Sequence, residues 1–564
     1  MTNTTASGGR SPRVFVLGFD AATFWLIDPW VAEGKLPNFA RLMREGVRGS
    51  LDSTIPYVSG PAWVSFATGV NPGKHGVFDF ARRQPGGYGI QLVNARDIRS
   101  ATLWSLLSQA GLRLGSLNCP VTYPPRPVNG FLVGGMLSPS LKSDFTYPKE
   151  LRDQLLRAVP DYLIESAETS PDRAQTKAAV ARNVRQGTQA RAKATRFLLE
   201  WLGHWDLFVS VYSETDRVMT YLWDDMDPQH PRHDPDLAAR FGHEILRHYQ
   251  ELDAILGQTM EEVVDERTTL LVLSDHGFGG VYRFFYPNRW LHEQGYLTLK
   301  QGSGTTGLVQ GAKGLLRRLR VAHLVKQTLH RLFPHWGFTS QLRQFAFTRD
   351  VDWSRTRAFW AADNGVTINV AGREPEGIVR PGAEYEALRD EIAAGLLALR
   401  EPGTGERVVA AVHRREEIYS GPYIAESPDL RVVWQEYPDE RRTHFSAGEL
   451  WGESTFGPAG QTGDHCYQGV FLAWGQGVRR GATIQGAAMV DVAPTILWLL
   501  GQPIPQEMDG RVLREAFEAD WAAQRPIQHS QGEARPPDAS ELAGFSDEES
   551  EAVRERLRGL GYLS

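Results

Sequence analysis

Cysteine is almost absent from this chain: only Cys119 and Cys466 occur among 564 residues, and they lie far apart. So few cysteines say little about disulfides, and a reducing compartment, the cytoplasm, is the expected location. Long apolar runs are also missing. No run approaches the roughly 18 apolar residues of a membrane-spanning helix, so none is expected. The polar stretch 1–13 lacks the apolar centre of a secretory signal peptide.

A strong charge of either sign is lacking too, because the formal net charge is −6. This balance argues against a protein that binds nucleic-acid polymers through bulk positive charge. The composition, 41% hydrophobic and 23% charged, is that of an ordinary globular protein. At this length we expect a large α/β core with insertions, or two domains.

One stretch, 301–349, contains no Asp or Glu at all, while Lys and Arg accumulate between leucines at near-helical spacing. A basic amphipathic helix over 313–331 is compatible with an anionic membrane surface. It is equally compatible with the lid of an anion site, or with the solvated face of a cap helix. We expect the cap more than membrane contact, since the basic and apolar positions alternate as in a packed helix.

Acidic residues and a histidine follow apolar runs that are typical of buried parallel strands. Asp275 and His276 end the run 270–274, Asp20 ends the run 14–19, and Asp216 follows the run 206–212. In open α/β sheets, ligands bind just beyond the carboxyl ends of the strands. Converging carboxylates repel one another unless a cation neutralises them. Oxygen and imidazole donors together predict zinc, manganese or a similar divalent ion.

A nucleophile candidate stands at Ser59, which is followed by Gly60 and Pro61. Proline is common in the first turn of a helix, so a helix is expected to begin here. A hydroxyl at that end faces the positive pole of the helix dipole and unpaired backbone N–H groups, which favours phosphate. The same pattern is also typical of a serine that caps a helix and has no chemical role.

At this point the chain resembles the alkaline phosphatase superfamily, and within it the type I phosphodiesterase/nucleotide pyrophosphatase proteins. The resemblance covers about residues 13–515 and depends on an ordered set of motifs. These are Asp20, Ser59-Gly60-Pro61-Ala62-Trp63, Thr68-Gly69, His75-Gly76, Asp216, Asp275-His276-Gly277 and His465. It implies a three-layer α/β/α sandwich with a mostly parallel central sheet. The expected organisation is a disordered start (1–12), a catalytic domain (13–520) with an inserted cap or lid (about 281–460), and a linker with a short C-terminal helix (521–564).

The resemblance also implies a site for two divalent metals, with zinc first and manganese as an alternative. One metal would be held by Asp20, Asp275, His276 and the Ser59 oxygen. The other would be held by Asp216, a histidine four residues later, and His465. Two such ions clamp the attacking and leaving oxygens of an in-line phosphoryl transfer. Ser59 would attack phosphorus and form a covalent intermediate, which water then hydrolyses.

Two positions depart from the family pattern. The histidine expected after Asp216 is Thr220, a poor neutral ligand for zinc. The second metal is therefore expected to bind weakly, unless His204, Cys466 or another residue supplies a ligand. The asparagine that nucleotide pyrophosphatases carry after the His-Gly motif is also missing, since this stretch is 77–80, Val-Phe-Asp-Phe. The nucleotide preference of those enzymes does not carry over.

The resulting prediction is a metal-dependent phosphohydrolase of phosphodiester or pyrophosphate type, acting on a small phosphate ester. The first alternative is a phosphomutase or phosphotransferase, because the same seryl and metal apparatus passes phosphate to an alcohol. The second alternative is a binding protein that kept the fold and lost one metal, which Thr220 favours.

Overall fold

The computed structural model describes residues 11–84, 86–165, 170, 172–300, 348–361, 365–447, 451–452, 454–530 and 544–560. The basic segment 313–331 lies outside these residues, so its role as a cap stays a prediction. None of the described helices combines the length and the apolar character that crossing a membrane requires.

A nine-stranded sheet forms the centre of the described chain, in the order β20-β2-β19-β9-β1-β8-β5-β6-β7. Its strands pair in parallel except where β19 and β7 join antiparallel. The strands are β1 (Arg13–Phe19), β2 (Val47–Asp52), β5 (Leu114–Leu117), β6 (Gly130–Val133), β7 (Thr146–Tyr147), β8 (Leu207–Tyr212), β9 (Thr268–Leu273), β19 (Gln468–Gly475) and β20 (Ala482–Ala488). The apolar runs predicted as buried strands are β1, β8 and β9.

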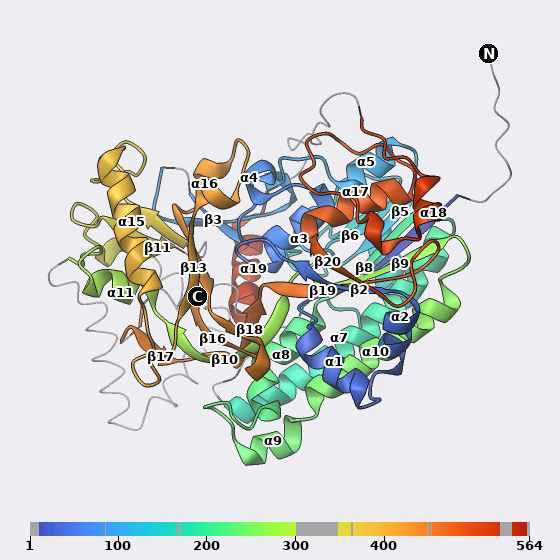
Figure 1. The fold of residues 1–564 in the computed structure, drawn as a ribbon, viewed down its shortest axis with the longest axis horizontal. Coiled ribbons are helices and arrows are strands. Elements are labelled where there is room, and N and C mark those ends of the chain that lie inside the picture. The colour runs from blue at the N-terminus through green and yellow to red at the C-terminus, as the bar shows by residue number, and fades with distance from the viewer. Residues whose placement is uncertain are drawn as a thin grey trace.

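Helices cover both faces of this sheet (Figure 1). One face carries α3 (Ser59–Thr68), α5 (Leu103–Gln109), α17 (Met489–Leu499) and α18 (Ala519–Ala523). The other carries α1 (Phe24–Ala32), α2 (Pro37–Glu45), α7 (Arg173–Leu202), α8 (Glu214–Met226) and α10 (Glu244–Glu262). Along β1, Val14 and Val16 belong to the apolar cluster under the first face, while Phe15 and Leu17 belong to the cluster under the second. This alternation with both faces buried confirms the three-layer α/β/α sandwich with a mostly parallel sheet.

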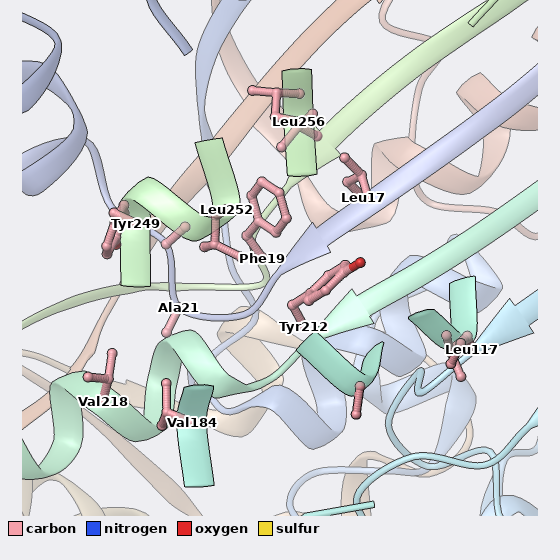
Figure 2. Packing of buried hydrophobic residues seen from close by; sticks show 14 of the residues in the cluster. Leu17, Phe19, Ala21, Leu117, Val184, Tyr212, Val218, Tyr249, Leu252 and Leu256 are labelled. Atoms are coloured by element: carbon pink, nitrogen blue, oxygen red, sulfur yellow. The ribbon is translucent and has the colours of Figure 1, made fainter. Parts of the chain in front are cut away.

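The cluster under the second face is drawn in Figure 2, where Phe19 at the end of β1 lies beside Tyr212 at the end of β8. The two rings pack edge to face with their centroids 5.8 Å apart. Tyr249 and Leu252 of α10 lie in the same cluster, and both are fully buried. Such packing fixes the carboxyl ends of the neighbouring strands relative to one another.

A second body of strands follows β9 in sequence and lies beside the central sandwich (Figure 1). One sheet contains β10 (Gly277–Phe285), β15 (Glu436–Tyr437), β16 (Arg442–Ala447), β17 (Phe456–Pro458) and β18 (Gly463–Cys466). Another contains β11 (Ala358–Ala361), β12 (Gly365–Ile368), β13 (Val409–Arg414) and β14 (Leu430–Trp434). The helices α11 (Pro287–Glu293), α15 (Ala383–Leu397) and α16 (Arg415–Ile418) accompany them. An apolar cluster of its own joins β10 to β11, β12 and α15.

Smaller elements complete the described chain: β3 (Ala81–Arg83), β4 (Ile90–Leu92), α4 (Pro72–His75), α6 (Leu151–Ala158), α9 (Pro235–Phe241) and α19 (Asp547–Gly559). The pattern over 235–262 predicts one helix, but the structure breaks it into α9 and α10. Gly242 and His243 lie at the break, and both keep backbone torsions in the right-handed helical region. The backbone at Gly242 approaches the carbonyl oxygen of Asp225 so closely that a Cβ atom would lie 2.8 Å from it. Trp521, within the expected linker, packs against the apolar cluster under α17.

Candidate active site

The three predicted strand ends meet at one edge of the sheet because β1 lies between β8 and β9. Phe19 is in register with Tyr212, and Gly18 is in register with Leu273. The backbone N–H of Asp20 donates to the carbonyl oxygen of Tyr212, 3.1 Å away. Parallel strands in this register deliver Asp20, the first turn of α8 and the Asp275-His276 pair to one place.

Ser59 is the first residue of α3, and its side chain is fully buried. The residue before it, Val58, has extended backbone and makes no capping hydrogen bond, so Ser59 is not the capping residue. Ser59 Oγ lies 3.1 Å from Nε2 of His276 and 3.4 Å from Oδ1 of Asp20. The hydroxyl therefore stands at the positive end of a buried helix and touches two of the predicted metal ligands.

Asp20, Asp275 and His276 form a group whose possible ligand atoms lie within 4.8 Å of one another. All of them are fully buried. Among the described residues, Oδ2 of Asp275 accepts no hydrogen bond, although Nε2 of His276 lies 3.3 Å away. Burial, and after it the charge of Asp275, raises the pKa of Asp20 well above its ordinary value. Buried carboxylates without enough donors are costly, and a bound cation removes that cost.

The imidazole of His276 is oriented for ligation. Its Nδ1 lies 3.0 Å from the carbonyl oxygen of Gly277. A carbonyl oxygen only accepts, so Nδ1 carries the proton and Nε2 presents its lone pair toward Asp275 and Ser59. Metal-ligating histidines typically hold their second nitrogen in this way. This donor set of two carboxylates, one unprotonated imidazole nitrogen and one hydroxyl fits a divalent metal.

A second group consists of Asp216, His276 and His465, again with possible ligand atoms within 4.8 Å. Here the carboxylate is already satisfied by hydrogen-bond donors. Oδ2 of Asp216 lies 3.1 Å from Nε2 of His465, and Oδ1 lies 3.0 Å from Nη1 of Arg217. Burial raises the pKa of Asp216, but Arg217 and the His465 contact outweigh it and hold that pKa well below its usual range.

Thr220 occupies the position at which the family pattern has histidine, one turn after Asp216 in α8. Its hydroxyl donates to the Asp216 backbone carbonyl at 3.0 Å and lies 3.2 Å from Oδ1. It therefore adds another donor to this carboxylate where a histidine would add a metal ligand. The first group, Asp20, Asp275 and His276, presents ligand atoms that fit a divalent cation, whereas the second is held together by hydrogen bonds.

The structure thus brings together all six predicted residues: Asp20, Ser59, Asp216, Asp275, His276 and His465. The two substitute ligands considered for Thr220 do not join them. His204 precedes β8, at the opposite end of that strand, and pairs loosely with Asp206. Cys466 is in register with Gly277 and belongs to neither group of possible ligands.

Two further residues of the site, Trp63 and Arg217, have no role there that the sequence predicts. The indole Nε1 of Trp63, one turn along α3 from Ser59, lies 3.3 Å from Oδ2 of Asp20 and donates to it. Trp63 does belong to the quoted motif, but its spacing gives no reason to expect this bond. Arg217 follows Asp216 directly, and its contact with the carboxylate of its neighbour depends on side-chain direction, which the sequence does not give.

Comparison with known proteins shows to which family the chain belongs. The sequence model of the type I phosphodiesterase/nucleotide pyrophosphatase family matches residues 14–443. The chain belongs to this family. The match contains Asp20, Ser59, Asp216 and the Asp275-His276 pair, and it ends before His465.

Solved structures were also compared. Murine ectonucleotide pyrophosphatase/phosphodiesterase 5 shares 14% identity with a TM-score of 0.47, covering 90% of this chain and 100% of that chain. Phosphonoacetate hydrolase from Sinorhizobium meliloti 1021, in complex with phosphonoacetate, shares 14% identity with a TM-score of 0.49, covering 87% and 97%. A search of curated proteins gave no match. Both TM-scores lie below 0.5, so the assignment depends on the family model.

Proposed function

We propose that this member of the family is a metal-dependent hydrolase of small phosphodiesters or pyrophosphates, with Ser59 as its nucleophile. The observation that carries the proposal is the first group, where Asp20, Asp275 and the lone pair of His276 converge beside the Ser59 hydroxyl. When bound there, a divalent metal would stabilise the seryl oxygen as an anion and polarise the phosphoryl group.

In this proposal Ser59, Asp20 and Trp63 have distinct roles. Ser59 Oγ forms a bond to phosphorus as the bond from phosphorus to the leaving oxygen breaks, and water later cleaves the seryl ester. The position of Ser59 at the start of α3 favours the negative charge of the phosphoryl group. The single hydroxyl hydrogen of Ser59 is within reach of two acceptors, Nε2 of His276 at 3.1 Å and Oδ1 of Asp20 at 3.4 Å. Trp63 holds the other oxygen of Asp20 and so keeps that carboxylate in place.

For the second group we propose one weak metal site beside the tight one. Asp216 and His465 supply two donors, but Thr220 offers hydrogen-bond donation in place of a nitrogen ligand. Zinc is proposed for the tight site, with manganese as the alternative, because the donors are mixed oxygen and nitrogen. Thr220→His is expected to tighten the weak site, and Thr220→Ala, which adds no ligand, is its matched control.

The test combines metal analysis with turnover. Purified protein is stripped with a chelator, titrated with Zn²⁺ or Mn²⁺ in a calorimeter, and screened against phosphodiesters, pyrophosphates and phosphomonoesters. One tight and one weak site, with activity rising as the weak site fills, support the proposal. Two equally tight sites contradict the assigned weakness of the second group. Absence of any metal binding with no turnover supports a binding protein that kept only the fold.

Labelled water separates hydrolysis from transfer. A hydrolase places oxygen from water in the released phosphoryl product, whereas a phosphotransferase passes the group to an alcohol without that label. We also propose a cytoplasmic location, which the free thiols of Cys119 and Cys466 support. The division into a catalytic domain (13–520), a cap (about 281–460) and a C-terminal segment (521–564) is likewise retained as a proposal.

A further inference from the structure

The C-terminal helix α19 ends directly beside the second group of ligands. The backbone carbonyl of Leu560, just beyond the helix, accepts a hydrogen bond of 3.0 Å from Nη1 of Arg217. The carbonyl of Gly559 accepts one from the hydroxyl of Tyr221. Both donors belong to α8, the helix that carries Asp216 in its first turn. Figure 1 shows α19 between the sandwich and the second body of strands.

Apolar packing holds α19 in this position. Val553, Leu557 and Leu560 are buried in one cluster with Val58, which directly precedes the nucleophile, and Val64 of α3. A helix attached only by exposed polar contacts would fray, whereas three buried apolar side chains give it a defined seat.

Polar contacts add to this seat along the length of the helix. The guanidinium of Arg556 donates to the backbone carbonyls of Met136, Ser138 and Pro139. At the other end, the ring of Phe545 stacks on Tyr123 with the centroids 5.7 Å apart. The end of α19 is therefore fixed relative to the site.

One nitrogen atom joins the helix to the site. Nη1 of Arg217 lies 3.0 Å from the Leu560 carbonyl oxygen and 3.0 Å from Oδ1 of Asp216. The carbonyl end of a helix carries partial negative charge and favours a cation. The end of α19 therefore helps to hold the positive charge of Arg217 against the carboxylate that a second metal would need.

We propose that Arg217 is a positioning residue that weakens divalent-cation binding at Asp216 and His465, and that docked α19 holds it there. This inference rests on the proposed function, because it concerns the weak site of that proposal. A cation entering the second group shares the Asp216 carboxylate with the guanidinium of Arg217, whose Nη1 lies 3.0 Å from Oδ1, and like charges at such short range repel. Thr220 adds to the effect, since its hydroxyl contacts the same oxygen.

Reciprocity follows from this arrangement. If docked α19 lowers the affinity of the second group for a cation, then a bound cation lowers the stability of docked α19 by the same factor. Docking of α19 and cation binding at the weak site are thus thermodynamically coupled. Both are measurable without turnover.

The experiment uses the full chain and calorimetric titration with Zn²⁺ alone. Arg217→Gln is expected to tighten the weak site by about tenfold or more, because a screened charge interaction reaches that size. Arg217→Lys keeps the charge and is expected to stay within about threefold of the parent protein. Arg554→Gln removes one positive charge from α19 itself, where Arg554 pairs with Glu551, and serves as the control for net charge.

A second variant tests the part played by the helix. Leu557→Glu places a charge in the buried seat of α19 and is expected to tighten the weak site in the same direction. The double variant with Arg217→Gln is expected to gain little more, because both changes remove the same contact. Hydrogen exchange at the amides of α19 should also rise when Zn²⁺ fills the weak site of the parent protein.

The outcomes separate this inference from the proposed function. If no tight site binds Zn²⁺ in any variant, the proposed function fails. If the tight site binds but Arg217→Gln leaves the weak site unchanged, weaker or absent, this inference fails. Equal effects of Arg217→Lys and Arg217→Gln also overturn it, because they would show that shape and not charge governs the site. Full retention of the tight site shows that each variant is folded.

Discussion

Glu436, a partly buried carboxylate in the second body of strands, gives a prediction for the pH dependence of stability. Glu436 of β15 accepts a hydrogen bond of 2.6 Å from the backbone N–H of Tyr467. Among the described side chains, none with a positive charge forms an ion pair with it. Burial raises the pKa of Glu436 from 4.5 to about 7, and the Tyr467 hydrogen bond opposes the rise only in part.

The magnitude follows from that shift. A pKa raised from 4.5 to about 7 corresponds to roughly 3 kcal/mol of stability, since each factor of ten in the proton affinity is worth about 1.36 kcal/mol. Below about pH 4.5 the carboxyl is protonated in both states and costs nothing. As the pH rises to about 7, the unfolded state loses its proton first, so the folded state becomes less stable. Above about pH 7 the full cost remains.

Glu436→Gln removes the charge and keeps an oxygen that accepts from Tyr467. We expect this variant to be more stable than the parent protein by about 2–3 kcal/mol at pH 8. The gain should nearly vanish at pH 4. Urea unfolding at a series of pH values measures both, with the protein in one fixed metal state. Asp439→Asn, at an exposed carboxylate two residues after β15, is the matched control and should show no such gain. An equal pH dependence of the parent and the Gln variant would refute the reasoning.

His276→Ala removes the nitrogen ligand of the first group and should lower tightly bound metal and activity together; full metal content by elemental analysis would show that His276 only packs. His248 is buried between the hydroxyls of Thr188 and Thr215, and burial lowers its pKa from 6.5 to about 3. Below about pH 6.5 the unfolded state binds a proton at His248 and the folded state does not, so the free energy of unfolding falls as the pH drops. His248→Gln should remove about 2–3 kcal/mol of that fall by pH 4.5, as measured by urea unfolding. An unchanged dependence of the free energy of unfolding on pH would contradict this prediction. Deletion of 313–331 should leave sedimentation with anionic liposomes unchanged, and strong, salt-sensitive sedimentation that the deletion abolishes would assign this segment to the membrane.

The sequence predicts the parts of this fold that follow from periodicity. The apolar runs at β1, β8 and β9 are each long enough for a strand and are followed by polar residues. The strands, and the candidate site residues at their carboxyl ends, can therefore be predicted from the sequence. The start of α3 at Ser59 is also predictable from the sequence, because Pro61 favours a first helical turn. The break between α9 and α10 is not predictable in this way, because the two residues between the helices, Gly242 and His243, keep right-handed helical torsions.

The candidate site, too, is predictable from the sequence only in part. Strand ends predict which acidic residues gather, because parallel strands in register must bring them together. The state of each carboxylate is not predictable from spacing. Oδ2 of Asp275 accepts no hydrogen bond, while Oδ1 accepts one from the backbone N–H of Ala21. The Asp216 carboxylate, in contrast, is contacted by Arg217, Thr220 and His465, which depends on the directions of those side chains. The contact of Arg217 with Leu560 joins residues 343 positions apart, and no local pattern encodes it.

The central claim is that Ser59 is the covalent nucleophile of a phosphoryl-transfer hydrolase. The most direct measurement is acid quenching of the metal-loaded protein during turnover of its best phosphodiester, followed by mass spectrometry of the peptide that carries Ser59. We predict a phosphoryl ester on Ser59 in the parent protein, its absence in Ser59→Ala, and a loss of turnover by several orders of magnitude in that variant. Near-normal kcat in Ser59→Ala, or the ester on another residue, would contradict the account.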